Sequence, residues 1–187
     1  MFKKLYKLLN SHGAAVLAVS AIFLAAWEGY ENRNHNRLSV LPHIGTLNSF
    51  NGREQSYELN LSSTGLGPAV ITGFYTFVDG KLAYPVENSS PWNDAKSFLR
   101  SNGLKVTADA SVGAGQFIPP GDSKNLLKVS RVDESVKLED WRESISKLGV
   151  LVCYCSVYGG NCAGVKTGSV NLEFLKQKDI VEQCKAL

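Results

Sequence analysis

An uncharged run of fifteen residues close to the amino terminus, residues 13–27, constrains this chain more than any other feature. Ser20 is the only polar side chain in it. A helix that crosses a bilayer needs about 20 mainly apolar residues. The run reaches that length when its flanking residues are included. We therefore expect a membrane-spanning anchor over residues 13–30.

The residues on either side of the run predict its orientation. Lys3, Lys4 and Lys7 precede it, and Trp27 and Tyr30 mark the far edge, where aromatic side chains favour the membrane interface. By the positive-inside rule, residues 1–12 form a basic cytoplasmic tail and the chain beyond the anchor crosses the membrane. In a bacterial cell, the anchor would lie in the inner membrane and the remaining chain in the periplasm.

Two other interpretations of the run compete with an anchor. A cleaved signal peptide has a similar basic start, but it needs small residues before its cleavage site. In this chain, the residue three positions before a cleavage site near Trp27 would be Phe23 or Leu24, and both are large. A buried core helix would explain neither the preceding lysines nor the polar tract EGYENRNHNR that follows. We favour the anchor, joined to the rest of the chain by a linker over residues 31–37.

The charge of the remaining chain argues against nucleic acid as a partner. With Lys3, Lys4 and Lys7 set aside, 17 Lys and Arg side chains balance 17 Asp and Glu side chains. A nucleic-acid-binding domain carries a basic patch or stripe on its own surface. The basic excess of this chain lies beside the membrane instead.

Residues 38–187 have the pattern of one mainly β domain. Short stretches that alternate apolar and polar residues, or that are apolar throughout, are typical of strands. About seven occur, over residues 37–50, 57–62, 69–78, 81–86, 104–111, 126–132 and 150–158. The spacing favours an antiparallel β-sandwich, immunoglobulin-like in the broad architectural sense. Residues 170–187 suggest a last strand followed by a short helix.

Two short helices interrupt the strands. Ser90 fits a helix cap with Pro91 at the first helical position, which predicts a helix that ends at Arg100. Apolar residues at helical spacing predict a second helix over residues 134–148, closed by Gly149.

Two sets of turn residues divide the strands. Gly65, Gly67 and Pro68 predict a tight connection, in which the glycines supply unusual backbone angles and the proline blocks strand pairing. Asp79 and Gly80 predict a two-residue hairpin turn.

Four cysteines lie near the carboxyl end, Cys153, Cys155, Cys162 and Cys184. In an exported domain, an even number of cysteines indicates disulfides. Cys153 and Cys155 share one face of a strand, and a turn after Tyr158 brings Cys155 opposite Cys162. We therefore expect Cys155–Cys162 and Cys153–Cys184, with Cys153–Cys162 and Cys155–Cys184 as the alternative. Cys-x-Cys lacks the usual spacing of a zinc site.

The sequence offers no complete catalytic constellation. His43 is the one histidine of the expected domain, and we interpret it as a strand-end residue. Glu139 and Asp140 are the closest pair of carboxylates, on the solvated side of a helix. Phosphate-loop and zinc-protease motifs are absent. We expect a protein that is not an enzyme and that holds no cofactor or metal.

Residues 63–81, STGLGPAVITGFYTFVDGK, and residues 154–162, YCSVYGGNC, carry a resemblance. They resemble a type of uncharacterised bacterial membrane-anchored protein with an amino-terminal anchor, a Gly-x-Gly-Pro-Ala unit between strands and a late Tyr-Cys-Ser-x-Tyr-Gly segment. The resemblance covers about half of the chain. A tryptophan that the resemblance leads us to expect soon after the hairpin is absent from this sequence. It implies architecture and location, without an activity.

Three functions are compatible with these features. The first is a non-catalytic interaction module at the outer face of the inner membrane, an accessory subunit that docks on a membrane or envelope protein. The second is a periplasmic domain that senses or binds a small ligand. The third is a thiol or metal protein that uses the cysteine cluster. We favour the first, because it needs only the anchor and a neutral domain.

Overall fold

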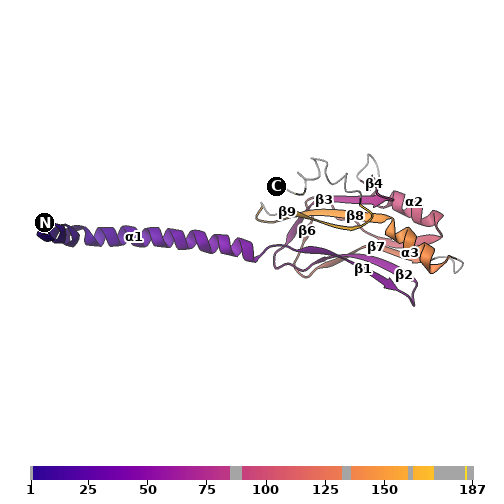
Figure 1. Cartoon of the computed structure of the whole chain (residues 1–187), viewed down its shortest axis with the longest axis horizontal. Helices are drawn as coiled ribbons and strands as arrows, with labels where there is room; N and C mark the ends of the chain where they lie inside the picture. Colours follow the sequence, from indigo (N-terminus) through magenta and orange to yellow (C-terminus); the bar gives the residue numbers. More distant parts are fainter. Residues whose placement is uncertain (1, 85–89, 132–135, 160–161, 171–183, 185–187) are drawn as a thin grey trace. The chain divides into compact units, whose positions relative to one another are not determined.

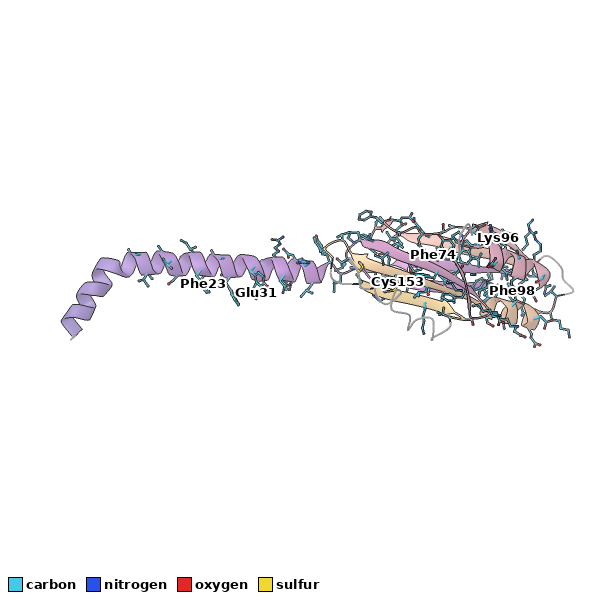
Figure 2. The ribbon with its side chains drawn as sticks, turned by 90° about the horizontal axis from the view of Figure 1, so that it is seen from above. Phe23, Glu31, Phe74, Lys96, Phe98 and Cys153 are labelled. Atoms are coloured by element: carbon cyan, nitrogen blue, oxygen red, sulfur yellow. A yellow bond between two sulfur atoms is a disulfide. The ribbon has the colours of Figure 1, made fainter. Side chains whose placement is uncertain are left out.

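The computed structural model of the protein describes residues 2–84, 90–131, 136–159, 162–170 and 184. The chain forms two compact units, residues 1–39 and 40–187. The first unit is a single helix, α1 (Phe2–Ser39). Its segment Gly13–Ser39 is long and apolar enough to cross a membrane. The side chains of Phe23 and Glu31 project from this helix (Figure 2).

Helix α1 is longer than the expected anchor, because residues 31–37, the expected linker, continue it as helix. Extending an existing helix adds one hydrogen bond for each residue that is ordered, so a polar tract without proline can continue it. Pro42 restricts the backbone of the residue before it and disfavours a helix there. The helix ends at Ser39, whose hydroxyl donates to the carbonyl of Asn36 at 3.0 Å.

The second unit is an antiparallel β-sandwich, which confirms the predicted fold class (Figure 1). One sheet has the strand order β1-β2-β7-β5. Its strands are β1 (Ile44–Asn51), β2 (Ser56–Ser63), β7 (Ser123–Arg131) and β5 (Leu104–Asp109). The other sheet has the order β4-β3-β8-β9, and β6 also pairs with β3. Its strands are β4 (Lys81–Tyr84), β3 (Ala69–Val78), β8 (Leu148–Ser156), β9 (Cys162–Gly168) and β6 (Phe117–Ile118).

Helices α2 (Asn93–Ser101) and α3 (Leu138–Ser146) lie at one end of the sandwich (Figure 1). The predicted start of α2 is wrong by about two residues. Pro91 and Trp92 form a turn, in which the Asn93 amide donates to the Ser90 carbonyl at 3.2 Å. Trp92 is buried and its indole Nε1 donates to the Ala110 carbonyl at 2.6 Å. Tertiary packing of this side chain therefore takes precedence over the serine cap.

Gly149 also differs from its predicted role, because α3 ends at Ser146 and Gly149 lies within β8. There it pairs with Gly168 of β9. A side chain at position 149 would meet the backbone carbonyl of Ser169. The glycine is needed for this close approach of two strands.

The two sheets enclose the main apolar core. Large side chains that are almost completely buried come from both sheets and from the helical segments: Leu61, Ile71, Trp92, Leu99, Leu104, Ile118, Leu126, Leu127, Val129 and Trp141. Strand β8 is buried along its whole length. Such a strand must be covered on both of its faces.

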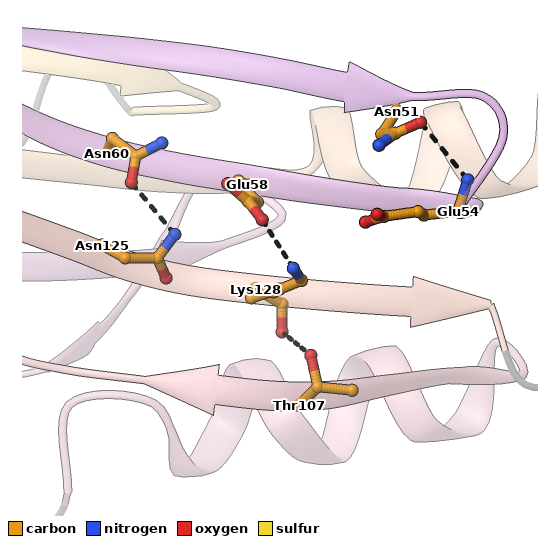
Figure 3. A network of polar contacts seen from close by, with 7 residues as sticks. All are labelled: Asn51, Glu54, Glu58, Asn60, Thr107, Asn125 and Lys128. Atoms are coloured by element: carbon orange, nitrogen blue, oxygen red, sulfur yellow. Dashed lines mark hydrogen bonds and ion pairs between the residues drawn. The ribbon is translucent and has the colours of Figure 1, made fainter.

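The outer faces of the two sheets have opposite character. On the first sheet, Glu58 pairs with Lys128 at 2.7 Å and Asn60 accepts from Asn125 at 3.0 Å, which forms a polar surface (Figure 3). On the second sheet, the outward residues form a separate buried apolar cluster. Its members are Tyr75, Phe77, Leu151 and Cys153, with Leu82, Val170 and Cys184 packed against them. The expected strand and helix over residues 170–187 lie outside the described residues, apart from Val170 and Cys184.

Candidate functional site

The four cysteines form two disulfides, Cys153–Cys184 and Cys155–Cys162. Cys155 and Cys162 are direct partners in the register of β8 and β9, with Cα atoms 4.0 Å apart. Cys153, which Figure 2 labels, lies two residues earlier on the same outward face of β8. It forms the disulfide with Cys184. All four cysteines lie within the described residues and none is free.

The connection between β2 and β3 packs against residues 40–43. The amide of Gly67 approaches the Leu41 carbonyl at 3.5 Å, and the amide of Thr64 donates to the His43 carbonyl at 2.8 Å. A side chain at Gly65 or Gly67 would overlap this backbone. Neither glycine has a positive φ angle, so the predicted reason for them is wrong. They permit close contact between two segments of backbone, and Pro68 follows immediately before β3.

Asp79 and Gly80 connect β3 to β4 as a two-residue turn, with φ angles of 51° and 72°. Positive φ at both central residues is the requirement of a type I′ hairpin turn. The amide of Asp79 also donates to the Lys147 carbonyl at 2.8 Å. The turn therefore lies beside the end of α3.

The lysines and aromatic residues that flank the predicted anchor all lie in α1. Lys3, Lys4 and Lys7 occupy its first two turns. Trp27 and Tyr30 expose 57% and 67% of their surface along the apolar part of the helix. No residue of Gly13–Ser39 is buried.

One end of the sandwich carries several large apolar side chains in solvent. This end is where residue 40 begins the domain, where β3 begins and where β8 ends. The side chains belong to four segments far apart in the sequence and are between 37% and 77% exposed. We call them the Leu66 surface: Leu41, Leu66, Phe117, Val157 and Tyr158.

Backbone pairing brings these four segments to the same end. The β2–β3 connection, which carries Leu66, contacts the backbone of Leu41. Phe117 of β6 is the register partner of Val70, near the start of β3. The partner of Val70 on its other side is Cys155, shortly before Val157. None of the five side chains of the Leu66 surface carries a charge.

The Leu66 surface was not predicted from the sequence. Leu66 was interpreted as part of a tight turn, and Val157 and Tyr158 as the end of a buried strand. β8 ends at Ser156 instead, so the two following side chains reach solvent. A leucine between two glycines in a tight connection has few neighbours to bury it. Leu66 is therefore the residue of the sequence that could have indicated this surface.

His43 lies before β1, apart from the neighbouring carboxylates Glu139 and Asp140 of α3. His43 is exposed, and its backbone carbonyl accepts hydrogen bonds from Thr64 and Gly65. Glu139 and Asp140 are exposed in the first turn of α3. Among the described residues, no group of three or more His, Cys, Asp and Glu side chains is arranged to hold a metal ion.

Comparisons with known proteins give no assignment. No family model matches the chain, and no curated protein is similar to it.

Proposed function

We propose that the protein is a non-catalytic interaction module, held at the outer face of a bacterial inner membrane by α1. The amino terminus lies in the cytoplasm and the β-sandwich in the periplasm. In this proposal the domain docks on another membrane or envelope protein as an accessory subunit of a larger complex.

The Leu66 surface is the observation that carries this proposal. Clustered exposed apolar side chains on a soluble domain mark an interaction site more often than single ones do. Leu41 follows the last residue of α1 by only two positions in the sequence, which supports a partner in the same membrane. The absence of charge among the five side chains fits an apolar protein surface as the partner.

Site-specific photocrosslinking in cells tests the docking surface. A photoreactive phenylalanine at position 66 should crosslink to a membrane or envelope protein. Position 138 is the matched control, because Leu138 is also an exposed leucine but begins α3 at the other end of the sandwich. Equal crosslinking at both positions, or none at position 66, would contradict the proposal.

A charge substitution gives a second measurement with the same pair of positions. Leu66→Asp should remove co-purification of the crosslinked partner, while Leu138→Asp should retain it. Both variants should keep the domain folded, since each leucine is exposed and surface changes usually alter stability by about 0.5 kcal/mol or less.

The location is tested separately from the docking. The full chain should fractionate with the membrane, and protease added to spheroplasts should degrade the domain. A mature protein with a new amino terminus near Trp27 would show that the segment is a signal peptide and would overturn the anchor.

A further inference from the structure

The end of the sandwich opposite the Leu66 surface contains a cavity of about 370 Å³. Its walls are apolar side chains from both sheets and from the segments that carry the helices. They are Tyr57, Leu59, Trp92, Leu127, Ile145, Leu148 and Val150. Cavities that hold small ligands are typically about 300–1,000 Å³ and mainly apolar, with a few polar groups. We call this space the Arg142 cavity.

The mouth of the cavity lies between the edge strands of the two sheets. Asn48 of β1 is the register partner of Leu59, and Thr167 of β9 is the partner of Val150. Both therefore face the interior of the sandwich, at positions where a larger apolar side chain would fill the core. Instead, the Asn48 amide donates to the Thr167 hydroxyl at 3.0 Å. This polar bridge forms one rim of the opening.

Arg142 and Phe50 form another part of the mouth. The guanidinium carbon of Arg142 lies 5.8 Å from the centre of the Phe50 ring. Phe50 also contacts Tyr57 and Trp141, with ring centres 4.8 Å and 5.5 Å away. These contacts hold an apolar surface beneath the cation.

Arg142 is the one charged side chain among the residues that line this cavity. Ion pairs among the described residues join Lys96 to Asp109, Lys128 to Glu58 and Lys147 to Glu143. Glu143, the acidic neighbour of Arg142 on α3, is therefore paired with a lysine. The guanidinium is left with an aromatic ring as its described partner, at the opening of an apolar space.

We propose that the Arg142 cavity binds a small anionic amphiphile, a monocarboxylate whose apolar body enters between the sheets and whose carboxylate pairs with the Arg142 guanidinium. The planar fork of arginine matches a carboxylate in two parallel hydrogen bonds. One positive charge at the mouth compensates one negative charge on the ligand. The second amide hydrogen of Asn48 and the hydroxyl hydrogen of Thr167, at the same mouth, offer further hydrogen bonds to the head group.

This binding site is independent of the docking at the Leu66 surface, because the two lie at opposite ends of the domain. Calorimetric titration of the full chain in lipid nanodiscs, with empty nanodiscs as the blank, is the test. Octanoate is the probe, and octanamide is its neutral comparator of the same shape. Octanoate should bind about tenfold more tightly, because charge-assisted hydrogen bonds are stronger than neutral ones.

Three variants assign the binding to this cavity. Arg142→Gln should weaken octanoate about tenfold and change octanamide by less than about twofold. Arg100→Gln, an exposed arginine on α2, should bind both compounds like the parent protein. Ser146→Trp adds a large ring at the exposed mouth and should abolish the binding of both.

Equal affinity for octanoate and octanamide would overturn the assignment of an anionic ligand. So would an Arg142→Gln variant that binds octanoate unchanged. Binding of neither compound above the empty nanodiscs would overturn the ligand site itself. Circular dichroism of each variant confirms that a loss of binding is not a loss of folding.

Discussion

The α carbon of Gly67 lies so close to the backbone carbonyl of Val40 that a β carbon at position 67 would overlap it. This approach joins the connection between β2 and β3 to the first residues of the domain. Both segments belong to the Leu66 surface. The shape of that surface therefore depends on a position where no side chain fits.

Gly67→Ala should destabilise the domain by about 1–3 kcal/mol, because either segment must move to admit the methyl group. Gly113→Ala is the matched control, since nothing lies within 4 Å of the added carbon and its φ angle is not positive. Denaturant unfolding of both variants measures the difference. Equal stability of the two would show that the contact between the segments is loose.

A second prediction concerns the hairpin turn at Gly80. Its φ angle is +72°, but a β carbon there would meet only the Ser169 hydroxyl, at 3.6 Å. The cost of a substitution is therefore conformational. Gly80→Val should lose about 1–2 kcal/mol of stability, and Gly80→Asn should lose less, because asparagine tolerates this backbone region. Thermal unfolding should rank the parent first, Asn next and Val last; any other order would contradict the turn.

A third prediction compares the two disulfides. Cys153–Cys184 closes a loop of 31 residues and Cys155–Cys162 a loop of 7. On the chain-entropy model these are worth about 3.7 and about 2.4 kcal/mol. Cys184 also packs on the outer apolar cluster of the second sheet. Replacing Cys153 and Cys184 with alanine should therefore cost more stability than replacing Cys155 and Cys162.

Oxidation of the cysteines tests the exported location at the same time. Protein that is isolated without reductant should contain no thiol that alkylates, and peptide mapping should recover the two bridges. Four reactive thiols would contradict both the bridges and the periplasmic domain. A smaller loss of stability from the 153–184 pair than from the 155–162 pair would contradict the loop argument alone.

The sequence predicted the sandwich because its central strands have a clear pattern. Tyr57, Leu59 and Leu61 alternate with polar residues, and all three are buried in β2. The apolar run over residues 150–158 predicted a buried strand, and β8 is buried along its whole length. β6 was missed, since two residues are too few to form a pattern. The helical continuation to Ser39 was also missed, because a polar tract has no local signal that separates helix from linker.

The candidate sites were harder to predict than the fold. The alternating faces of a strand placed Cys153 and Cys155 together from spacing alone. The Leu66 surface combines four distant segments, and Arg142 meets Phe50 only through tertiary packing. The exposure of a side chain depends on where strands end and on which strands form the edges of the sheets. Asn48 and Thr167 illustrate this, because their inward positions predict core residues while the structure places them at an open rim.

The last prediction uses the titration of Tyr57 in the wall of the Arg142 cavity. Burial raises the pKa of its phenol to about 12, from 10.0 in water. The folded state therefore holds this proton more tightly than the unfolded state. The contribution of the bound phenolic proton to the free energy of unfolding is fully present below pH 10 and is lost as the pH rises from about 10 to about 12. The loss should reach about 2–3 kcal/mol, since one pKa unit corresponds to about 1.4 kcal/mol.

Tyr57→Phe separates this effect from the other alkaline titrations of the protein. The variant keeps the ring in the cavity wall but has no phenolic proton, so it should lose less stability than the parent between pH 10 and pH 12. Unfolding free energies of both proteins, measured in denaturant at several pH values, give the comparison. Parallel pH profiles would mean that the Tyr57 phenol is reached by solvent, and the cavity would then be more open to water than its apolar walls imply.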